Sequence, residues 1–444
     1  MKEALNGIQI APKDAIGVIE RHLLVDGFPL VIDLEKSQGS RLVDHRDGKS
    51  YLDFFMFFAS VPIGFNHPRM TEPEFVDKLG RVAVNKPSNS DFYTTYMAEF
   101  VDACDRHAIP AELPHMFLVS GGSLGVENAL KAAFDYKVRK NFKAGEKNEL
   151  GSKVIHFRDA FHGRSGYTLS LTNTDPVKTD YFPKFNWPRI SNPAIEFPMA
   201  DHMADIEARE EKAKAEIKAA ISEHGNDIAA LITETIQGEG GDNHYRPEFF
   251  QFLRQITEEN DIIFICDEVQ TGVGLTGKFW AYEHMGVVPD AITFGKKMQT
   301  CGIMCSKKFD DVDSVFDVSG RINSTWGGNL IDMVRAARYL DIIAEENLVQ
   351  NAADVGEHLL RRMETVREKY PDVVSNIRGR GLMAAFDLPE EKRDDFRKKV
   401  YENGLILVGC GPRSIRFRPA LNVAREEIDE GIEIIDRSLA AILG

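Results

Sequence analysis

The sequence lacks the features that mark membrane, nucleic-acid-binding and secreted proteins. No apolar stretch in its 444 residues approaches the roughly 20 residues that a membrane-spanning helix needs, and the opening MKEALNGIQIAPKD has no apolar signal core. The chain carries 54 basic and 69 acidic residues, and its net charge of -15 disfavours binding to nucleic acid or an anionic membrane. We therefore expect a cytoplasmic protein.

The cysteine and histidine patterns argue against a disulfide framework and against a metal site. The five cysteines form no CxxC pair and are too few for a disulfide framework, so we expect free thiols. The twelve histidines form no HExxH motif and no cluster, and the sequence therefore predicts no metal site.

What the chain does contain is an alternation of apolar runs and helical patterns. HMFLVS, KVIHFR, DIAALITE, DIIFICDE and DAITFG read as buried strands between helices, which is typical of an α/β domain with a mostly parallel sheet. RLVDHRDGKSYLDFF reads as an antiparallel ribbon, and the strand-like runs after position 329 indicate a smaller α+β lobe. We expect an N-terminal segment (1–65) that joins this lobe, a large domain (66–328) and a C-terminal small domain (329–444).

Chemically suggestive residues follow four of the predicted strands, where ligands bind in open parallel sheets. They are the small residues Gly121 to Ser123, the FHGR run 161–164, Asp267, and the lysine pair 296–297. Each also has an ordinary explanation: a tight turn, a core aromatic, a helix N-cap or solvated lysines. Together they match what pyridoxal phosphate needs, namely a lysine for its aldehyde, a carboxylate for its ring nitrogen, an aromatic for its ring and a helix start for its phosphate.

Several longer motifs of the sequence resemble those of a known family. ICDEVQTGVGLTG followed by PDAITFGKK, together with ETIQGEGG, FHGR and NSTWGGN, resembles the class III aminotransferases of fold type I over nearly the whole chain. The resemblance implies an α/β fold whose large domain has a mostly parallel, seven-stranded type of sheet. It also selects Lys296 as the cofactor-binding lysine and leaves Lys297 as an exposed or partner-facing neighbour.

The resemblance further implies a cofactor site for pyridoxal 5'-phosphate. Gly122 and Ser123 would hold the phosphate, Phe161 would stack on the ring, Asp267 would pair with the ring nitrogen and Gln270 would bond the ring oxygen. Thr325 would reach the cofactor of the neighbouring subunit, which implies a homodimer. Two departures from the common motifs stand out, Thr235 in place of proline and Leu275 in place of arginine.

Within the family, NKPSNSDFYT, IQGEGGDNHYRPEFF and IRFRPALNV most resemble members that transfer the side-chain amino group of L-lysine to 2-oxoglutarate. The resemblance implies that Arg164 binds the far carboxylate of either substrate and Arg418 the near carboxylate of 2-oxoglutarate. Glu239 would pair with Arg418 during the lysine half-reaction, and Asn323 would line the substrate channel. Without the resemblance, Glu239 reads as a solvated loop acid, and Arg416 and Arg418 read as the exposed face of an edge strand.

Three alternatives remain open from the sequence. The first is another class III aminotransferase, acting on ornithine, acetylornithine or 4-aminobutyrate. The second is an aminomutase or isomerase on the same scaffold, which would need no 2-oxoglutarate. The third is a cofactor-binding protein without catalysis, which intact Lys296, Asp267 and Gln270 disfavour.

Overall fold

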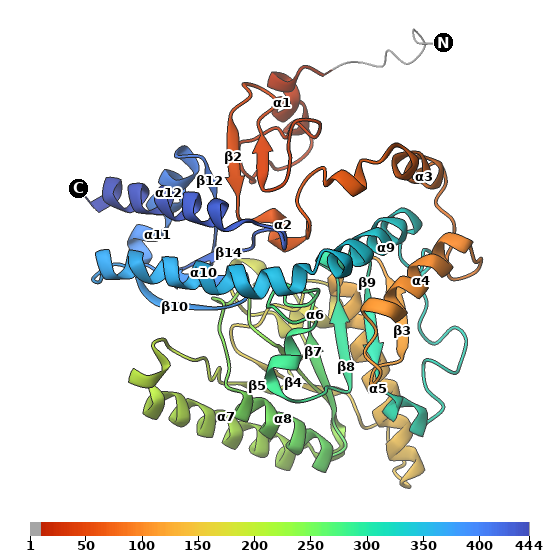
Figure 1. Cartoon of the computed structure of the whole chain (residues 1–444). Coiled ribbons are helices and arrows are strands. Elements are labelled where there is room, and N and C mark those ends of the chain that lie inside the picture. The colour runs from red at the N-terminus through yellow and green to blue at the C-terminus, as the bar shows by residue number, and fades with distance from the viewer. Residues whose placement is uncertain (1–9, 444) are drawn as a thin grey trace.

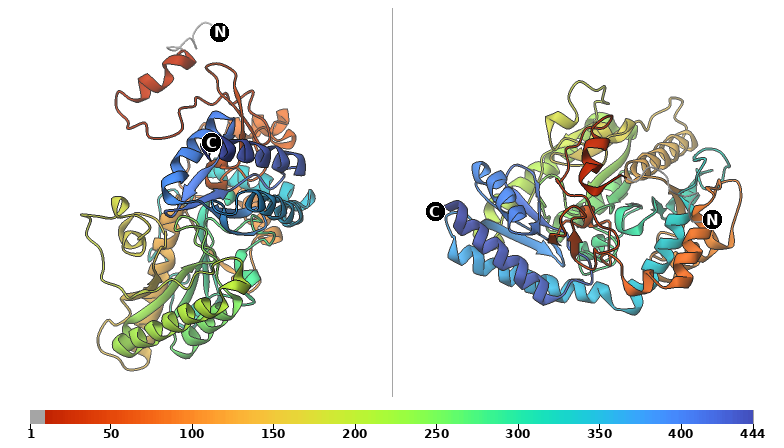
Figure 2. Two further views of the ribbon diagram at one scale, coloured as in Figure 1. Left: turned by 90° about the vertical axis from the view of Figure 1, so that its left-hand side faces the viewer. Right: turned by 90° about the horizontal axis from the view of Figure 1, so that it is seen from above.

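The structure is a computed structural model that describes residues 10–443. A large domain surrounds a central sheet, a smaller domain lies beside it, and the N-terminal segment extends beyond both (Figures 1 and 2). None of the helices in residues 10–443 is both long and apolar enough to cross a membrane.

The large domain is organised by a seven-stranded sheet. In spatial order its strands are β3 (His115–Val119), β9 (Cys301–Cys305), β8 (Ala291–Phe294), β7 (Ile263–Asp267), β6 (Ile228–Glu234), β4 (Lys153–Phe157) and β5 (Arg189–Ile190). The run from β8 to β5 is parallel, and β9 is antiparallel to both of its neighbours. This confirms the predicted α/β fold, although the sequence patterns did not reveal β9 or the very short β5.

Both faces of this sheet are buried, which explains the nearly continuous apolar strands. Along β7, Ile263 and Ile265 pack on one side, whereas Phe264 and Cys266 pack on the other. Helix α5 covers the first face, and helices α4, α8 and α9 contribute to the core on the second. The helices of this half of the molecule are α2 (Met56–Ala59), α3 (Pro73–Ala83), α4 (Thr95–His107), α5 (Gly122–Lys143), α6 (Gly166–Leu171), α7 (Met203–His224), α8 (Pro247–Glu259) and α9 (Leu330–Glu345).

The smaller domain combines the two ends of the chain. Its four-stranded antiparallel sheet has the order β10 (Ser375–Arg380), β11 (Met383–Asp387), β14 (Ser414–Phe417) and β13 (Val408–Cys410). A second sheet has the order β1 (Arg41–Val43), β2 (Ser50–Asp53) and β12 (Leu405–Ile406), with β12 parallel to β2. Helices α10 (Leu348–Lys369), α11 (Glu390–Glu402) and α12 (Arg425–Leu443) pack around these sheets, and the short α1 (Ala15–Ile19) precedes them.

Helix α9 connects the two domains. It packs against α3 and α4 rather than within the small lobe, and Arg106 of α4 donates to Asp341 of α9 at 2.9 Å. The first helix beyond position 329 is therefore built onto the large domain, and the chain enters the small domain at α10.

Close backbone contact between α5, β9 and β3 requires glycine at position 302. A Cβ added there would lie 2.1 Å from the carbonyl oxygen of Phe117, whereas a Cβ at Gly80, on the exposed side of α3, would meet nothing within 4 Å. We expect Gly302→Ala to destabilise the protein by about 1–3 kcal/mol or more and to lower its thermal unfolding midpoint. Gly80→Ala should leave the midpoint unchanged or raise it, because alanine favours a helix interior by about 0.5–1 kcal/mol over glycine. Equal shifts in the two variants would contradict this account.

Candidate active site

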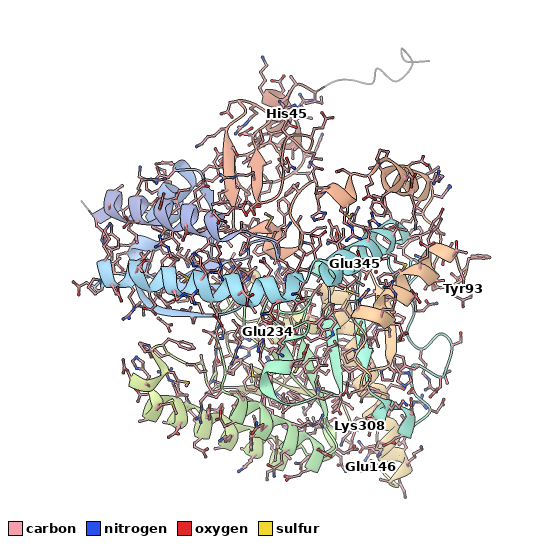
Figure 3. The ribbon with its side chains drawn as sticks, in the orientation of Figure 1. His45, Tyr93, Glu146, Glu234, Lys308 and Glu345 are labelled. Atoms are coloured by element: carbon pink, nitrogen blue, oxygen red, sulfur yellow. The ribbon has the colours of Figure 1, made fainter. Side chains whose placement is uncertain are left out.

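A cavity of about 380 Å³ lies where the parallel strands of the large sheet end. It is lined by Gly122, Ser123, Phe161, His162, Gly163, Glu234, Asp267, Val269, Gln270 and Lys296. Six of the residues predicted from the sequence therefore meet in one place. Glu234, at the end of β6, lies near the middle of the molecule where the domains adjoin (Figure 3).

The start of α5 forms one wall of this cavity. Gly121 precedes the helix with φ of 110°, and no side chain in the described part of the chain caps the first turn, so its N–H groups remain available to an anion. Neighbouring segments pack tightly here: a Cβ on Gly122 would lie 2.8 Å from Val269 Cγ1, and one on Gly163 would lie 2.3 Å from Ser123 Oγ. Small residues therefore let this helix start approach the cavity.

Asp267 ends β7 and is buried as an ionised group. His162 Nδ1 lies 2.7 Å from its Oδ2, and Thr293 Oγ1 and the Val269 N–H donate to its Oδ1 at 2.9 and 3.1 Å. Burial acts to raise the pKa of Asp267, but the hydrogen bonds and the charge of His162 hold it below its ordinary value. In turn the pKa of His162 is raised by Asp267 despite burial. The result is a fixed carboxylate that can keep a pyridine nitrogen protonated.

The two adjacent lysines have different environments. Lys296 has φ of 48°, an uncommon value for a residue with a side chain, and lies on the cavity; burial lowers its pKa to about 8. Lys297 is fully buried, donates from Nζ to the carbonyl oxygen of Gln270 at 2.6 Å, and has a pKa far below its ordinary value because of burial. The expectation that Lys297 is exposed or faces a partner is therefore wrong: it holds the backbone of Gln270.

Glu239 pairs with an arginine, but not with the one expected. Its Oε2 accepts from Arg416 Nη2 at 2.7 Å, and its Oε1 contacts Lys178 Nζ at 2.5 Å. The expected pair with Arg418 is thus replaced by a pair with Arg416. Both cations, together, hold the pKa of Glu239 below its usual range although burial acts in the opposite direction.

Arg418 has a different role from the one that we expected. Its guanidinium forms a completely buried ion pair with Asp242, and its Nε and Nη2 donate to Gln270 Oε1 at 3.0 and 2.8 Å. A guanidinium with these partners is not free to receive a substrate carboxylate. It orients Gln270 instead, leaving the amide N–H₂ of Gln270 to face the cavity as a donor for a ring oxygen.

The remaining predicted residues are not part of the cavity wall. Arg164, Asn323 and Thr325 are exposed. The backbone near Thr325 is held by Ser90, whose Oγ donates to the carbonyl oxygen of Ser324 at 2.7 Å. The roles proposed for these three residues from the resemblance stay predictions.

Three residues of the site were not singled out from the sequence: Lys178, Glu234 and Asp242. Glu234 ends β6 just as Asp267 ends β7, and the same strand-end rule could have found it; burial raises its pKa to about 7. Lys178 and Asp242 lie in turns whose paths the sequence pattern does not indicate.

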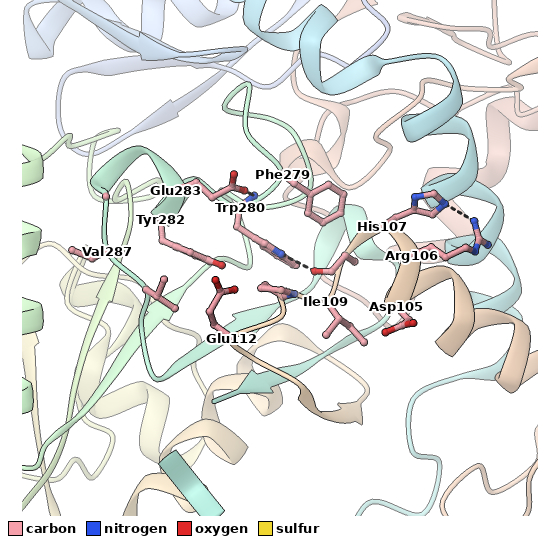
Figure 4. A pocket seen from close by; sticks show the side chains of 14 residues that line it. Asp105, Arg106, His107, Ile109, Glu112, Phe279, Trp280, Tyr282, Glu283 and Val287 are labelled. Atoms are coloured by element: carbon pink, nitrogen blue, oxygen red, sulfur yellow. Dashed lines mark hydrogen bonds between the residues drawn. The ribbon is translucent and has the colours of Figure 1, made fainter. Parts of the chain in front are cut away.

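A second cavity, of about 970 Å³, lies beside the C-terminal end of α4 (Figure 4). There Trp280 Nε1 donates to the carbonyl oxygen of Ala108 at 2.8 Å, and Arg106 is engaged by Asp341. These two polar groups thus serve the packing of the surrounding segments. The smaller cavity at the strand ends carries the perturbed titratable groups and is the candidate active site.

The residues of the strand-end cavity fit pyridoxal phosphate. They supply an uncapped helix start, an aromatic ring at Phe161, a buried carboxylate that stays ionised at Asp267, and a lysine whose pKa is lowered to about 8. His162 Nε2 is also buried without a hydrogen-bond partner among residues 10–443, so the residues around the cavity leave one of their own polar atoms unsatisfied.

Comparison with known proteins agrees with this geometry. The aminotransferase class-III family model matches residues 25–439. The L-lysine-epsilon aminotransferase of Mycobacterium tuberculosis is 48% identical over 442 residues, covering 99% of this chain and 98% of its own. That of Streptomyces clavuligerus is 46% identical and covers 97% and 95%. The solved lysine aminotransferase from M. tuberculosis superposes with a TM-score of 0.94 at 46% identity, covering 98% of this chain and all of its own. The protein therefore belongs to the class III aminotransferases and uses pyridoxal phosphate as its cofactor.

Proposed function

We propose that the protein is an L-lysine 6-aminotransferase, which transfers the ε-amino group of L-lysine to 2-oxoglutarate and yields 2-aminoadipate 6-semialdehyde and L-glutamate. The near full-length likeness to enzymes named for this activity supports the proposal, at 46–48% identity. The observation that carries the mechanism is the Glu239–Arg416 pair beside the cofactor cavity.

The two substrates make opposite demands on one site. Lysine enters amine-first, with its carboxylate far from the reacting carbon, whereas 2-oxoglutarate places a second carboxylate next to that carbon. A cation near the cofactor is therefore needed for one substrate and disfavoured by the aliphatic chain of the other. A guanidinium whose charge can be neutralised by a nearby carboxylate meets both demands.

Arg416 has the features of such a guanidinium. Its side chain is 2% exposed, and its Nε and Nη1 are buried without partners among the described residues, while Nη2 is taken by Glu239. Its guanidinium carbon lies 5.0 Å from the Phe58 ring. When Glu239 leaves, Nη2 and an adjacent unused donor form a planar fork suited to a carboxylate, so we assign to Arg416 the role that the family resemblance gave to Arg418. Glu239 pairs with Arg416 during the lysine half-reaction and leaves the guanidinium free for 2-oxoglutarate.

The remaining roles follow from position and protonation. When bound, pyridoxal phosphate supplies the aldehyde that takes up an amino group and a ring that accepts electrons. Asp267 would keep the ring nitrogen protonated, Gln270 would donate to the ring oxygen, and Phe161 would pack on the ring. Lys296, once its amine is released by substrate, would take the proton from the ε-carbon of lysine and deliver it to the C4′ carbon of the cofactor. The exposed Arg164 would bind the far carboxylate, and Asn323 would line the substrate channel.

We also propose a homodimer in which Thr325 reaches the partner's cofactor. Phe92, Tyr93 and Trp326 are 73%, 82% and 39% exposed, and Tyr93 points outward at the rim of the molecule (Figure 3). The segments that carry them are joined by Asn89, whose Nδ2 donates to the carbonyl oxygen of Trp326 at 2.9 Å. Exposed aromatics on connected segments favour an interface at this surface.

The lowered pKa of Lys296 predicts how the rate of cofactor uptake depends on pH. Only the neutral amine attacks an aldehyde, and with a pKa of about 8 the neutral fraction grows as the pH rises through that value. The rate of pyridoxal phosphate uptake by cofactor-free protein, followed by absorption, should therefore increase with pH and level off above about 8. Lys296→Ala should show no such pH-dependent phase. A rate in the wild type that stays constant through this range would contradict the role of Lys296.

The proposed substrate is tested by single-turnover absorption measurements without keto acid. L-Lysine, L-ornithine, 4-aminobutyrate and N-acetylornithine are added separately, and we expect lysine to convert the cofactor fastest and 2-oxoglutarate to restore it. Lys296→Ala should slow the conversion by at least about 100-fold. Preference for another amine would leave only the family assignment, and conversion that keto acid cannot reverse would favour an aminomutase.

Hybrid dimers test the position of Thr325. Lys296→Ala and Thr325→Val chains are each expected to retain cofactor poorly after dialysis. If Thr325 acts across the interface, a mixture of the two allows one complete site per hybrid, with Lys296 from one chain and Thr325 from the other. Cofactor retention should then recover in the mixture. No recovery in verified hybrid dimers would mean that Thr325 acts within its own chain or not at all.

A further inference from the structure

The carboxylate of Glu239 lies between two cations that come from different parts of the fold. Arg416 belongs to β14 and contacts Oε2, whereas Lys178 ends the short turn Pro176–Lys178 and contacts Oε1. Their exposures differ: the Arg416 side chain is 2% exposed, against 25% for Lys178 and 24% for Glu239. Arg416 thus faces the interior and Lys178 the solvent side of the same carboxylate.

The turn that carries Lys178 is held in place independently of Glu239. Asp175 caps its turn by accepting from the Val177 N–H at 3.0 Å, and Lys184 Nζ donates to the carbonyl oxygen of the next residue, Thr179. The Lys178 ammonium also lies 5.8 Å from the ring of Phe161, on the wall of the cofactor cavity. The backbone position from which Lys178 reaches Glu239 therefore does not depend on the state of the Glu239–Arg416 pair.

We propose that Lys178 is a positioning residue that retains Glu239 when Glu239 leaves Arg416, and that it thereby sets the affinity of the site for dicarboxylic keto acids. This inference rests on the proposed function, in which Arg416 must be freed for 2-oxoglutarate. Removing Glu239 from Arg416 would otherwise leave a half-buried carboxylate without a cation, which costs free energy. With Lys178 on the solvent side, the carboxylate exchanges two cationic partners for one and keeps a charge-assisted hydrogen bond.

The direction of the effect follows from this arrangement. If Lys178 keeps its contact after the switch, its removal makes the open state less favourable and weakens binding of a dicarboxylate. If Lys178 served only to hold Glu239 against Arg416, its removal would ease the switch and tighten that binding. The sign of the change in affinity therefore distinguishes a retaining contact from a restraining one.

Equilibrium binding of glutarate, an unreactive dicarboxylate, to the cofactor-loaded enzyme provides the test by calorimetry. We expect Lys178→Met to raise the dissociation constant of glutarate by about three- to tenfold, as for a partly exposed pair with one charge-assisted contact. Pentanoate, which has one carboxylate, should bind with unchanged affinity. Lys178→Arg should restore glutarate binding. In turnover, Lys178→Met should raise KM for 2-oxoglutarate by a larger factor than it lowers kcat.

Two further variants make the result specific. Lys140→Met removes a lysine of a comparable but distant ion pair, Lys140 Nζ to Asp311 Oδ2 at 2.8 Å, and should leave glutarate binding unchanged. In a Glu239→Gln background, Lys178→Met should have no additional effect, because no charged side chain remains to be retained.

The outcomes separate this inference from the proposed function. Unchanged or tighter glutarate binding in Lys178→Met, or a loss that persists in the Glu239→Gln background, would overturn the role of Lys178. If Arg416→Met does not weaken glutarate binding in the otherwise native enzyme, the assignment of Arg416 as the near-carboxylate site fails instead.

Discussion

The active site depends on keeping one buried carboxylate ionised. Asp267 lies at the end of a strand that is buried on both faces, where an unpaired charge would take up a proton. His162, Thr293 and the backbone of Val269 prevent this by surrounding its two oxygens with donors. The sheet therefore does more than support the site: Thr293 on the neighbouring strand β8 supplies one of the hydrogen bonds that keep the carboxylate ionised, and the loops after β4 and β7 supply the others.

Buried charges are also compensated at Arg418 and Arg416, where side chains of both signs meet. Arg418 and Asp242 neutralise each other completely in the interior, and the pair serves to orient Gln270. Arg416 is equally buried but is only partly satisfied, since Glu239 takes one of its donors. The arginine that orients Gln270 and the arginine proposed to bind substrate thus differ in how many of their donors the protein itself occupies.

The sequence predicted the fold class and the strand-end groups that line the cavity because both follow from simple rules, whereas the choice of Lys296 and the inclusion of Gln270 came from the family resemblance. Buried parallel strands are continuous apolar runs, and the residues directly after them share one edge of the sheet. It could not assign the two arginines, because positions 416 and 418 have the same parity along a strand and so share a face. The choice depends on the loop that carries Asp242, which has φ of 50° after Gly241 at 133°. Likewise the left-handed backbone at Lys296 decides which way Lys297 points, and the residue pattern does not encode it.

The parallel pairing of β2 with β12 has a consequence for how the protein forms during synthesis. The partner of β2 leaves the ribosome only after nearly the whole of the remaining chain, including every strand of the central sheet. The ribbon at the N-terminal end cannot complete its own sheet until then, because pairing over so long a loop is slow and its entropy cost is not repaid early. The central sheet is therefore in a position to assemble first, and the edge of β2 stays open to other chains for most of translation.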